Sequence, residues 1–181
     1  SVIWLKQQHA DARVIAFEPD PANFRLLEKN IASYKLHDIT CHNAAVWKED
    51  TTRTFSAAGG MASGFTNTIS KDTVSVPCLR LKHFLQEPID FLKLDIEGAE
   101  WEVLNDCASS LGMVKRIFVE YHGQFNEQEK LVNILNILKN AGFHYYLREA
   151  ASLYPTPFDR TKSSEHPYQV QLNIFGFRAG E

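Results

Sequence analysis

Short apolar runs alternate along the chain with segments in which apolar residues recur every three or four positions. The apolar runs, at Arg13–Phe17, Ile89–Ile96 and Val114–His122, are typical of strands that are buried on both faces. Segments of the second kind follow Pro21 and Asn126 and are typical of amphipathic helices. The alternation predicts an α/β fold with a mainly parallel sheet and right-handed crossovers.

Several element boundaries carry their own signals. Asp20 is a good N-cap and Pro21 a good first helical residue, which predicts a helix from there to about Ser33. The last two apolar segments, Gly142–Glu149 and Tyr168–Arg178, have no helical pattern between them, so we expect them to pair antiparallel at one edge of the sheet. No linker or internal repeat divides the chain, and we expect residues 1–181 to form a single domain.

The middle of the chain departs from this alternation. The stretch AAVWKEDTTRTFSA predicts a two-stranded excursion, and Val74–Leu81 predicts a strand in which Pro77 indicates an edge or a bend. Ala57–Ser70 is rich in Gly, Ser and Thr, which predicts a mobile loop or, alternatively, a lid over a ligand. Its GGMASG does not follow a strand and open a helix, so it is not a phosphate-binding glycine fingerprint.

The composition argues against several classes of function. The chain has 181 residues, of which 44% are hydrophobic and 23% charged, as in ordinary globular domains. A net charge of −3 gives no electrostatic footprint for nucleic acid or an anionic membrane, and no apolar run reaches the roughly 18 residues of a membrane span. The three cysteines form no CxxC pair and lie in apolar stretches, which predicts buried, reduced thiols and a cytoplasmic location.

Polar residues follow each predicted core strand, and in open parallel sheets ligands bind outside the carboxyl ends of the strands. Glu18, Asn43, Asp95 and His122 occupy such positions. A carboxylate in the place of Glu18 can accept two hydrogen bonds from the diol of a ribose. The alternative is that Glu18 caps the next helix or is solvated.

Asp95 follows an apolar strand, so we expect a largely buried carboxylate that needs a partner. Lys93 lies two residues away on the same strand face and is the candidate ion partner. Glu97 points to the same side if the strand continues, and Gly98 permits a tight turn into the next helix. Glu97 and Glu100 lie near the N-terminus of that helix, where negative charge is favourable, and this alone could explain Glu100.

His122 is a candidate general base because the ordinary pKa of histidine is about 6.5, although a strand-end histidine bonded to a backbone carbonyl is the alternative. Asp95, Glu97, Glu120 and His122 together could hold a divalent metal, but their spacing does not require one, and we expect no metal. The sequence contains no Ser-His-Asp order, HExxH motif or paired-cysteine pattern.

Three stretches, FEPDPANFRLLEKNI, NAAVWKED and above all IDFLKLDIEGAEWEVL, resemble the FkbM-type methyltransferases, which are class I enzymes that use S-adenosylmethionine. The resemblance extends from about Ser1 to Arg178, nearly the whole chain. It implies a Rossmann-like sheet of seven strands in the order 3-2-1-4-5-7-6, with the final strand antiparallel. It also implies O-methylation of a hydroxyl group on a sugar or a small secondary metabolite.

The resemblance also implies roles for individual residues. Glu18, with Pro19 beside it, would bind the ribose of S-adenosylmethionine, and Asn43 and Ala44 would border the adenine. Asp95 would lie by the methionine end of the cofactor or by the acceptor. We therefore take Asp95 as a candidate for both cofactor binding and catalysis, and we take two further residues as catalytic candidates, Glu97 and His122.

One departure from the family pattern is large. The family opens with a strand and a glycine-rich loop just before the helix that here begins at Ser1, and neither is in this sequence. That strand belongs between Arg13–Phe17 and Ile89–Leu94. We therefore expect an N-terminally truncated sheet or a rearranged sheet centre, whose exposed strand edges would favour homo-oligomers.

Two other functions remain open at this point. The chain could be a non-catalytic module that retains the scaffold. It could also belong to a nicotinamide-dependent oxidoreductase, which would need a GxGxxG motif in the absent segment.

Overall fold

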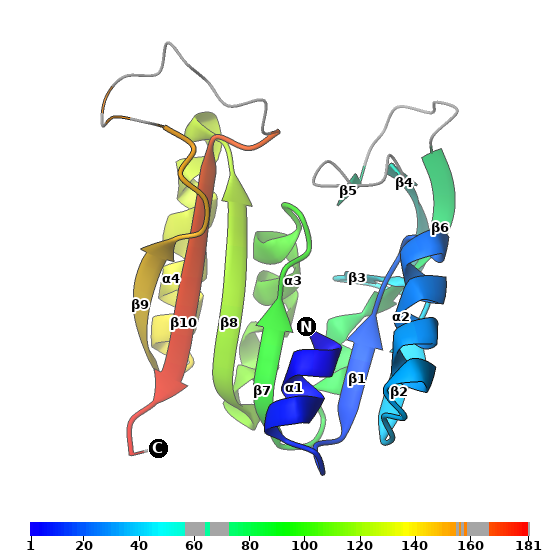
Figure 1. Cartoon of the computed structure of the whole chain (residues 1–181). Coiled ribbons are helices and arrows are strands. Elements are labelled where there is room, and N and C mark those ends of the chain that lie inside the picture. Colours follow the sequence, from blue (N-terminus) through cyan, green and yellow to red (C-terminus); the bar gives the residue numbers. More distant parts are fainter. Residues whose placement is uncertain (57–63, 66–72, 155, 157, 159–166, 181) are drawn as a thin grey trace.

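The parallel strands form where the sequence has its short apolar runs. The computed structural model describes residues 1–56, 64–65, 73–154, 156, 158 and 167–180. Two strands, β1 (Val14–Phe17) and β2 (Ile39–His42), pair in parallel. Four others form a second sheet in the order β7-β8-β10-β9 (Figure 1), with bounds β7 Ile89–Leu94, β8 Val114–Gly123, β9 Phe143–Glu149 and β10 Val170–Arg178.

The antiparallel pairing of the late strands is confirmed. β10 lies between β8 and β9 and runs antiparallel to both, whereas β7 and β8 are parallel. The four strands therefore follow the order 4-5-7-6 that the family resemblance implies, and β2 and β1 follow its order 3-2. An α/β fold with parallel cores and an antiparallel edge is thus the architecture of the chain.

Two helices, α3 (Glu100–Cys107) and α4 (Gln128–Asn140), cover one face of the four-stranded sheet (Figure 1). The other helices are α1 (Val2–Gln8) and α2 (Pro21–Ser33), and the 3-10 turns are η1 (Leu81–Phe84), η2 (Ala108–Met113) and η3 (Phe125–Glu127). α3 and α4 pack against each other and against β8. They bury Leu104, Ile134 and Leu138 with Val119 in the core. As expected, α2 begins at its Asp20 cap, whose carboxylate accepts hydrogen bonds from two backbone N–H groups.

The middle of the chain forms a further sheet in the order β3-β6-β4-β5. Its strands are β3 (Ala45–Trp47), β4 (Thr51–Ser56), β5 (Gly64–Phe65) and β6 (Thr73–Arg80). As expected, the stretch AAVWKEDTTRTFSA forms two strands, β3 and β4, but they do not pair with each other, because β6 lies between them. Pro77 lies in the part of β6 that pairs with β4 alone, because β6 pairs with β3 only from Cys78 onward. Among the described residues this part of the strand is an edge, as expected, and the missing N–H of Pro77 breaks no bond to β3.

The sheet of β1 and β2 does not pair with the four-stranded sheet of β7, β8, β10 and β9. Among the described residues, no strand pairs with the edge of β1 opposite β2 or with the edge of β7 opposite β8. The expectation that these strands are buried on both faces is wrong, because Ile15 is 40% exposed and Phe91 45% exposed. The break in strand order lies at the expected position, and an ion pair between Arg13 and Glu87 spans it at 2.9 Å.

Three other expectations concern the surface and the thiols. Most of the expected loop or lid at Ala57–Ser70 lies outside the described residues, apart from the two residues of β5. Cys41, Cys78 and Cys107 are free thiols, of which the last two are buried. Within the described part of the chain, no helix has the length and apolar character needed to cross a bilayer.

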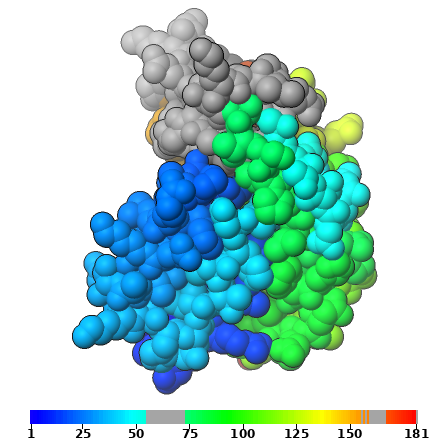
Figure 2. All heavy atoms as spheres, turned by 90° about the vertical axis from the view of Figure 1, so that its right-hand side faces the viewer, coloured from blue at the N-terminus to red at the C-terminus, as the bar shows by residue number. Residues whose placement is uncertain are grey.

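A charged pair joins the middle sheet to α3. The guanidinium of Arg80, at the end of β6, donates to both carboxylate oxygens of Asp106 over 2.9 and 2.6 Å. This hydrogen bonding lowers the pKa of Asp106 below its ordinary value, and the carboxylate is only 16% exposed. Figure 2 shows the green residues of the middle of the chain beside the blue and cyan residues of its N-terminal part.

We expect the Asp106→Asn substitution to lower the free energy of unfolding at pH 7 by about 1–3 kcal/mol, because it removes a charge-assisted bidentate pair. A carboxylate whose pKa is lowered by folding contributes stability above its unfolded pKa and loses it as the pH falls through the folded pKa. The difference from wild type should therefore shrink below about pH 4. Urea unfolding across this pH range measures it, and a difference that does not change with pH would contradict it.

The matched control is Asp11→Asn, which removes the same charge from an exposed position. Its free energy of unfolding should stay close to the wild-type value.

Candidate active site

The turn Asp95–Gly98 joins β7 to α3 and has an unusual backbone. Glu97 has a φ of +54° and Gly98 a φ of +93°, so both lie in the left-handed region that favours glycine. A Cβ atom at Gly98 would come within 3.4 Å of the ring of Tyr168. A glutamate in this conformation costs on the order of 1 kcal/mol, and such costs are typical of turns that carry function.

Glu100 holds the turn in place from the start of α3. Its side chain is 1% exposed, and its Oε1 atom accepts hydrogen bonds from the backbone N–H groups of Ile96 at 3.3 Å and Gly98 at 3.1 Å. The same oxygen lies 3.1 Å from Nδ1 of His122. These three donors, together with the N-terminus of the helix, stabilise a carboxylate that would otherwise be costly to bury.

His122 lies near the end of β8, and its side chain is 2% exposed. Because the carboxylate of Glu100 accepts, Nδ1 carries the proton, and Nε2 faces the rim of the sheet. Nε2 lies 3.7 Å from an oxygen of Glu97 and 3.7 Å from an oxygen of Glu120. Burial lowers the pKa of His122. The bond to Glu100 and the charges of the surrounding carboxylates raise it by more than burial lowers it, so the pKa lies above its ordinary value.

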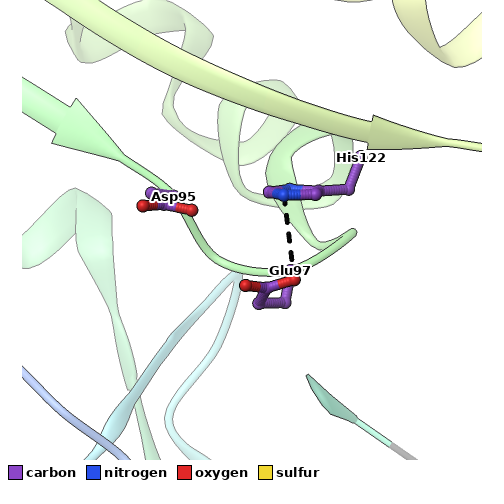
Figure 3. A group of neighbouring side chains, drawn as sticks. All are labelled: Asp95, Glu97 and His122. Carbon is purple, nitrogen blue, oxygen red and sulfur yellow. Dashed lines mark ion pairs between the residues drawn. The ribbon is translucent and has the colours of Figure 1, made fainter. Parts of the chain in front are cut away.

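The three catalytic candidates of the sequence converge at this rim. Asp95, Glu97 and His122 each place a ligand-type atom within 4.8 Å of the others (Figure 3). Because β7 ends at Leu94, Glu97 reaches the side of Asp95 through the left-handed turn and not through the continued strand that the sequence suggests. Lys93 forms the expected ion pair with Asp95. Burial raises the pKa of Glu97, while the charge of His122 opposes that rise.

The expectation that Asp95 is largely buried is wrong, because its side chain is 32% exposed. Its strand, β7, is the edge of its sheet within the described residues, so no described neighbour covers this end. The exposed carboxylate of Asp95 can contact a substrate directly, whereas the buried side chain of His122 lies behind its neighbours.

Tyr168 completes the cluster and was not expected from the sequence. Its hydroxyl donates to the backbone oxygen of Glu97 over 2.7 Å, and its ring lies 4.8 Å from the ring of His122. Burial and the nearby carboxylates raise the pKa of Tyr168 above its ordinary value. It precedes β10 and meets the turn from 71 residues away, so no local sequence signal could have identified it.

The other group of candidates lies at the ends of β1 and β2. The side-chain amide of Asn43 donates to the backbone oxygens of Glu18 at 2.8 Å and Pro19 at 3.3 Å, which ties the two strand ends together. Ala44 is 3% exposed. Asp20, rather than Glu18, caps α2, so the capping alternative for Glu18 is wrong.

The carboxylate of Glu18 is half-buried and accepts a hydrogen bond from the backbone N–H of Asp20 at 2.9 Å. Burial raises its pKa. The rings of Phe17, His42 and Phe84 pack within 5.0–5.4 Å of one another, so η1 supports the ends of β1 and β2. A shallow pocket beside the turn is lined by Trp47, Glu97, Gly98, Ala99 and Glu102.

We expect the Glu100→Ala substitution to destabilise the protein by about 3–5 kcal/mol, because it leaves three buried donors without their shared acceptor. Glu100→Gln keeps one acceptor oxygen and should recover part of the loss. Urea unfolding at pH 7 measures both.

The matched control is Glu129→Ala, which removes an exposed glutamate from the first turn of α4 and should change stability little. Equal effects of Glu100→Ala and Glu129→Ala would show that Glu100 does not organise the turn.

Comparisons with known proteins identify the family of the chain. The family model of the methyltransferase FkbM domain matches residues 4–145. "Methyltransferase 1" of Beauveria bassiana (strain ARSEF 2860) is 24% identical over 128 residues, which cover 56% of this chain and 51% of that protein. The chain thus spans about half the length of this curated relative.

A solved structure has the same fold. The crystal structure of methyltransferase FkbM from Methylobacillus flagellatus KT superposes with a TM-score of 0.63 at 16% sequence identity, over 97% of this chain and 40% of that one. The fold is therefore shared across a wide divergence in sequence. Since the family model matches more than half of its residues, the chain belongs to the FkbM methyltransferase domain family.

Proposed function

We propose that the protein is an S-adenosylmethionine-dependent methyltransferase that methylates a hydroxyl oxygen of a sugar or a small secondary metabolite. Family membership supports methyl transfer. One observation supports the cofactor assignment. Glu18 directly follows β1, and the acidic cluster lies at the carboxyl ends of β7 and β8, on the same rim. Carboxyl ends of parallel strands are where open α/β sheets bind nucleotide-like ligands.

In this proposal the adenosine lies at the ends of β1 and β2. The half-buried carboxylate of Glu18 has only one described hydrogen bond to its side chain, from Asp20, so lone pairs remain for a ribose diol. Pro19 adjoins it, and Asn43 and Ala44 border the adenine. The bonds from Asn43 to the backbone at Glu18 and Pro19 preorganise this side of the site.

The acidic cluster suits the other half of the cofactor. The sulfonium of S-adenosylmethionine is a cation, and the negative potential of Asp95 and Glu97 favours it. Methyl transfer breaks the bond between sulfur and the methyl carbon and forms a bond from that carbon to the acceptor oxygen. The enzyme holds the two partners in line, and the hydroxyl proton passes to a carboxylate.

Asp95 and Glu97 are the carboxylates exposed enough to take that proton, since their side chains are both 32% exposed. The raised pKa of Glu97 makes it a better proton acceptor than an ordinary glutamate. His122 is too buried to touch an acceptor and acts through Glu97, whose carboxylate it faces. We therefore assign Asp95 and Glu97 to the reacting groups and His122 to their positioning.

The second candidate function is a non-catalytic module that has kept this scaffold. If Glu18→Ala and Asp95→Ala both leave the cellular function of the protein intact, methyl transfer is not its role. Loss of function in both variants, with unchanged expression and stability, supports the enzyme.

We expect the full-length protein to bind S-adenosylhomocysteine with a measurable heat in a calorimetric titration. Glu18→Gln keeps the size of the side chain but removes the charge that pairs with the ribose diol, so affinity should fall by about 10-fold or more. Glu28→Gln, on the exposed side of α2, is the matched control and should bind as wild type does.

The absence of heat, together with no rise in melting temperature on adding the ligand, would contradict the cofactor assignment. Equal affinities of Glu18→Gln and wild type would contradict the role of Glu18 alone.

A further inference from the structure

Four carboxylates surround one imidazole at the rim of the sheet. Glu97 and Glu120 face Nε2 of His122, Glu100 faces its Nδ1, and Asp95 adjoins Glu97. Among the described residues, the one lysine paired with this group is Lys93, which bonds to Asp95. Negative charge therefore exceeds positive charge where the side chains converge.

The imidazole is prepared to act as a ligand. Its side chain is 98% buried, since 2% is exposed, and Glu100 fixes the proton on Nδ1. The other ring nitrogen, Nε2, faces the carboxylates of Glu97 and Glu120. A histidine that donates its other ring N–H to a buried carboxylate is the arrangement that orients metal-binding histidines in proteins.

The distances leave room for an ion and are too long for direct bonds. Nε2 lies 3.7 Å from Glu97 and from Glu120, beyond the distance of roughly 2.7–2.9 Å of a charge-assisted hydrogen bond. Two ligands bound at about 2.1 Å to one ion lie roughly 3–4.2 Å apart. The whole group of Asp95, Glu97 and His122 spans no more than 4.8 Å, so small side-chain movements bring all three into range.

We propose that Asp95, Glu97 and His122 bind one divalent transition-metal ion, with Glu120 available as a fourth ligand. A mixed set of one imidazole and carboxylates suits Mn²⁺, Fe²⁺, Co²⁺ or Zn²⁺ better than Ca²⁺ or Mg²⁺, which prefer oxygen alone. The spacing in the sequence predicts no metal. The potential metal ligands come together only in the folded chain, where the turn Asp95–Gly98 lies beside the end of β8.

The ion would occupy an accessible position. Asp95 and Glu97 are each 32% exposed, so the remaining coordination positions are open to water or to a substrate oxygen. An ion there would lower the pKa of a bound hydroxyl, which is the activation that the proposed methyl acceptor needs. That consequence rests on the proposed function, whereas metal binding itself does not.

The test is a titration of the EDTA-treated protein with Mn²⁺ at pH 7.5, in which the electron paramagnetic resonance signal of free Mn²⁺ reports binding. No methyl donor or acceptor is present, so a failed cofactor titration leaves this test unaffected. We expect one Mn²⁺ per chain. Asp95→Asn and His122→Gln should each weaken binding at least 10-fold, and Glu100→Gln should weaken it about 10–100-fold because it removes the charge that orients the imidazole.

Two matched controls make the same kinds of substitution outside the proposed metal site. Asp90→Asn changes an exposed aspartate at the start of β7, and His37→Gln changes an exposed histidine that contacts Asp38. Both should bind Mn²⁺ as wild type does. Circular dichroism checks that each variant is folded. If His122→Gln is unfolded, the result for Asp95→Asn tests the metal site alone, because Asp95 is partly exposed and its substitution should not disturb the fold.

Two results would overturn the proposal. One is the absence of binding by both Mn²⁺ and Zn²⁺ up to about 1 mM, the weak end of specific protein sites for divalent ions. The other is Mn²⁺ binding that is equally tight in wild type and Asp95→Asn.

Discussion

The buried carboxylate of Glu100 is the constraint on which the geometry of the rim depends. One oxygen atom accepts from two backbone N–H groups of the turn and lies within hydrogen-bond distance of the imidazole of His122. These contacts hold three elements together, the end of β7, the start of α3 and the end of β8. They also hold Glu97 in a left-handed conformation that a glutamate would not adopt by preference.

Function follows from what this constraint leaves exposed. Glu100 and His122 are buried, while Asp95 and Glu97 keep about a third of their side chains open to ligands. The rim therefore has partly exposed carboxylates in front and a hydrogen-bonded support behind them, which is the kind of arrangement that positions reacting groups in enzymes. In the proposed function, Glu18, which follows β1, would supply a separate carboxylate for the other part of the cofactor.

Much of the fold could be predicted from the sequence because its signals are local. Asp20 and Pro21 determine where α2 begins, and the apolar runs locate β1, β7 and β8. The insertion of β6 between β3 and β4 could not be predicted, because strand neighbours are determined by long-range pairing. Nor could the exposure of Ile15 and Phe91, since an apolar run does not reveal whether a neighbouring strand is present.

The site shows the same division between local and long-range information. Spacing along IDFLKLDIEGAE indicated that Asp95 and Glu97 share one side if the strand continues. The strand ends at Leu94, and the left-handed turn brings the two carboxylates together instead. The contacts of Glu100 with His122 and of Tyr168 with Glu97 join residues 22 and 71 positions apart, so no local pattern could reveal them. The most direct test is a crystal structure of the full-length protein with S-adenosylhomocysteine. Our account predicts the ribose on Glu18 and the sulfur beside Asp95–Gly98, and a ligand bound away from this rim would contradict it.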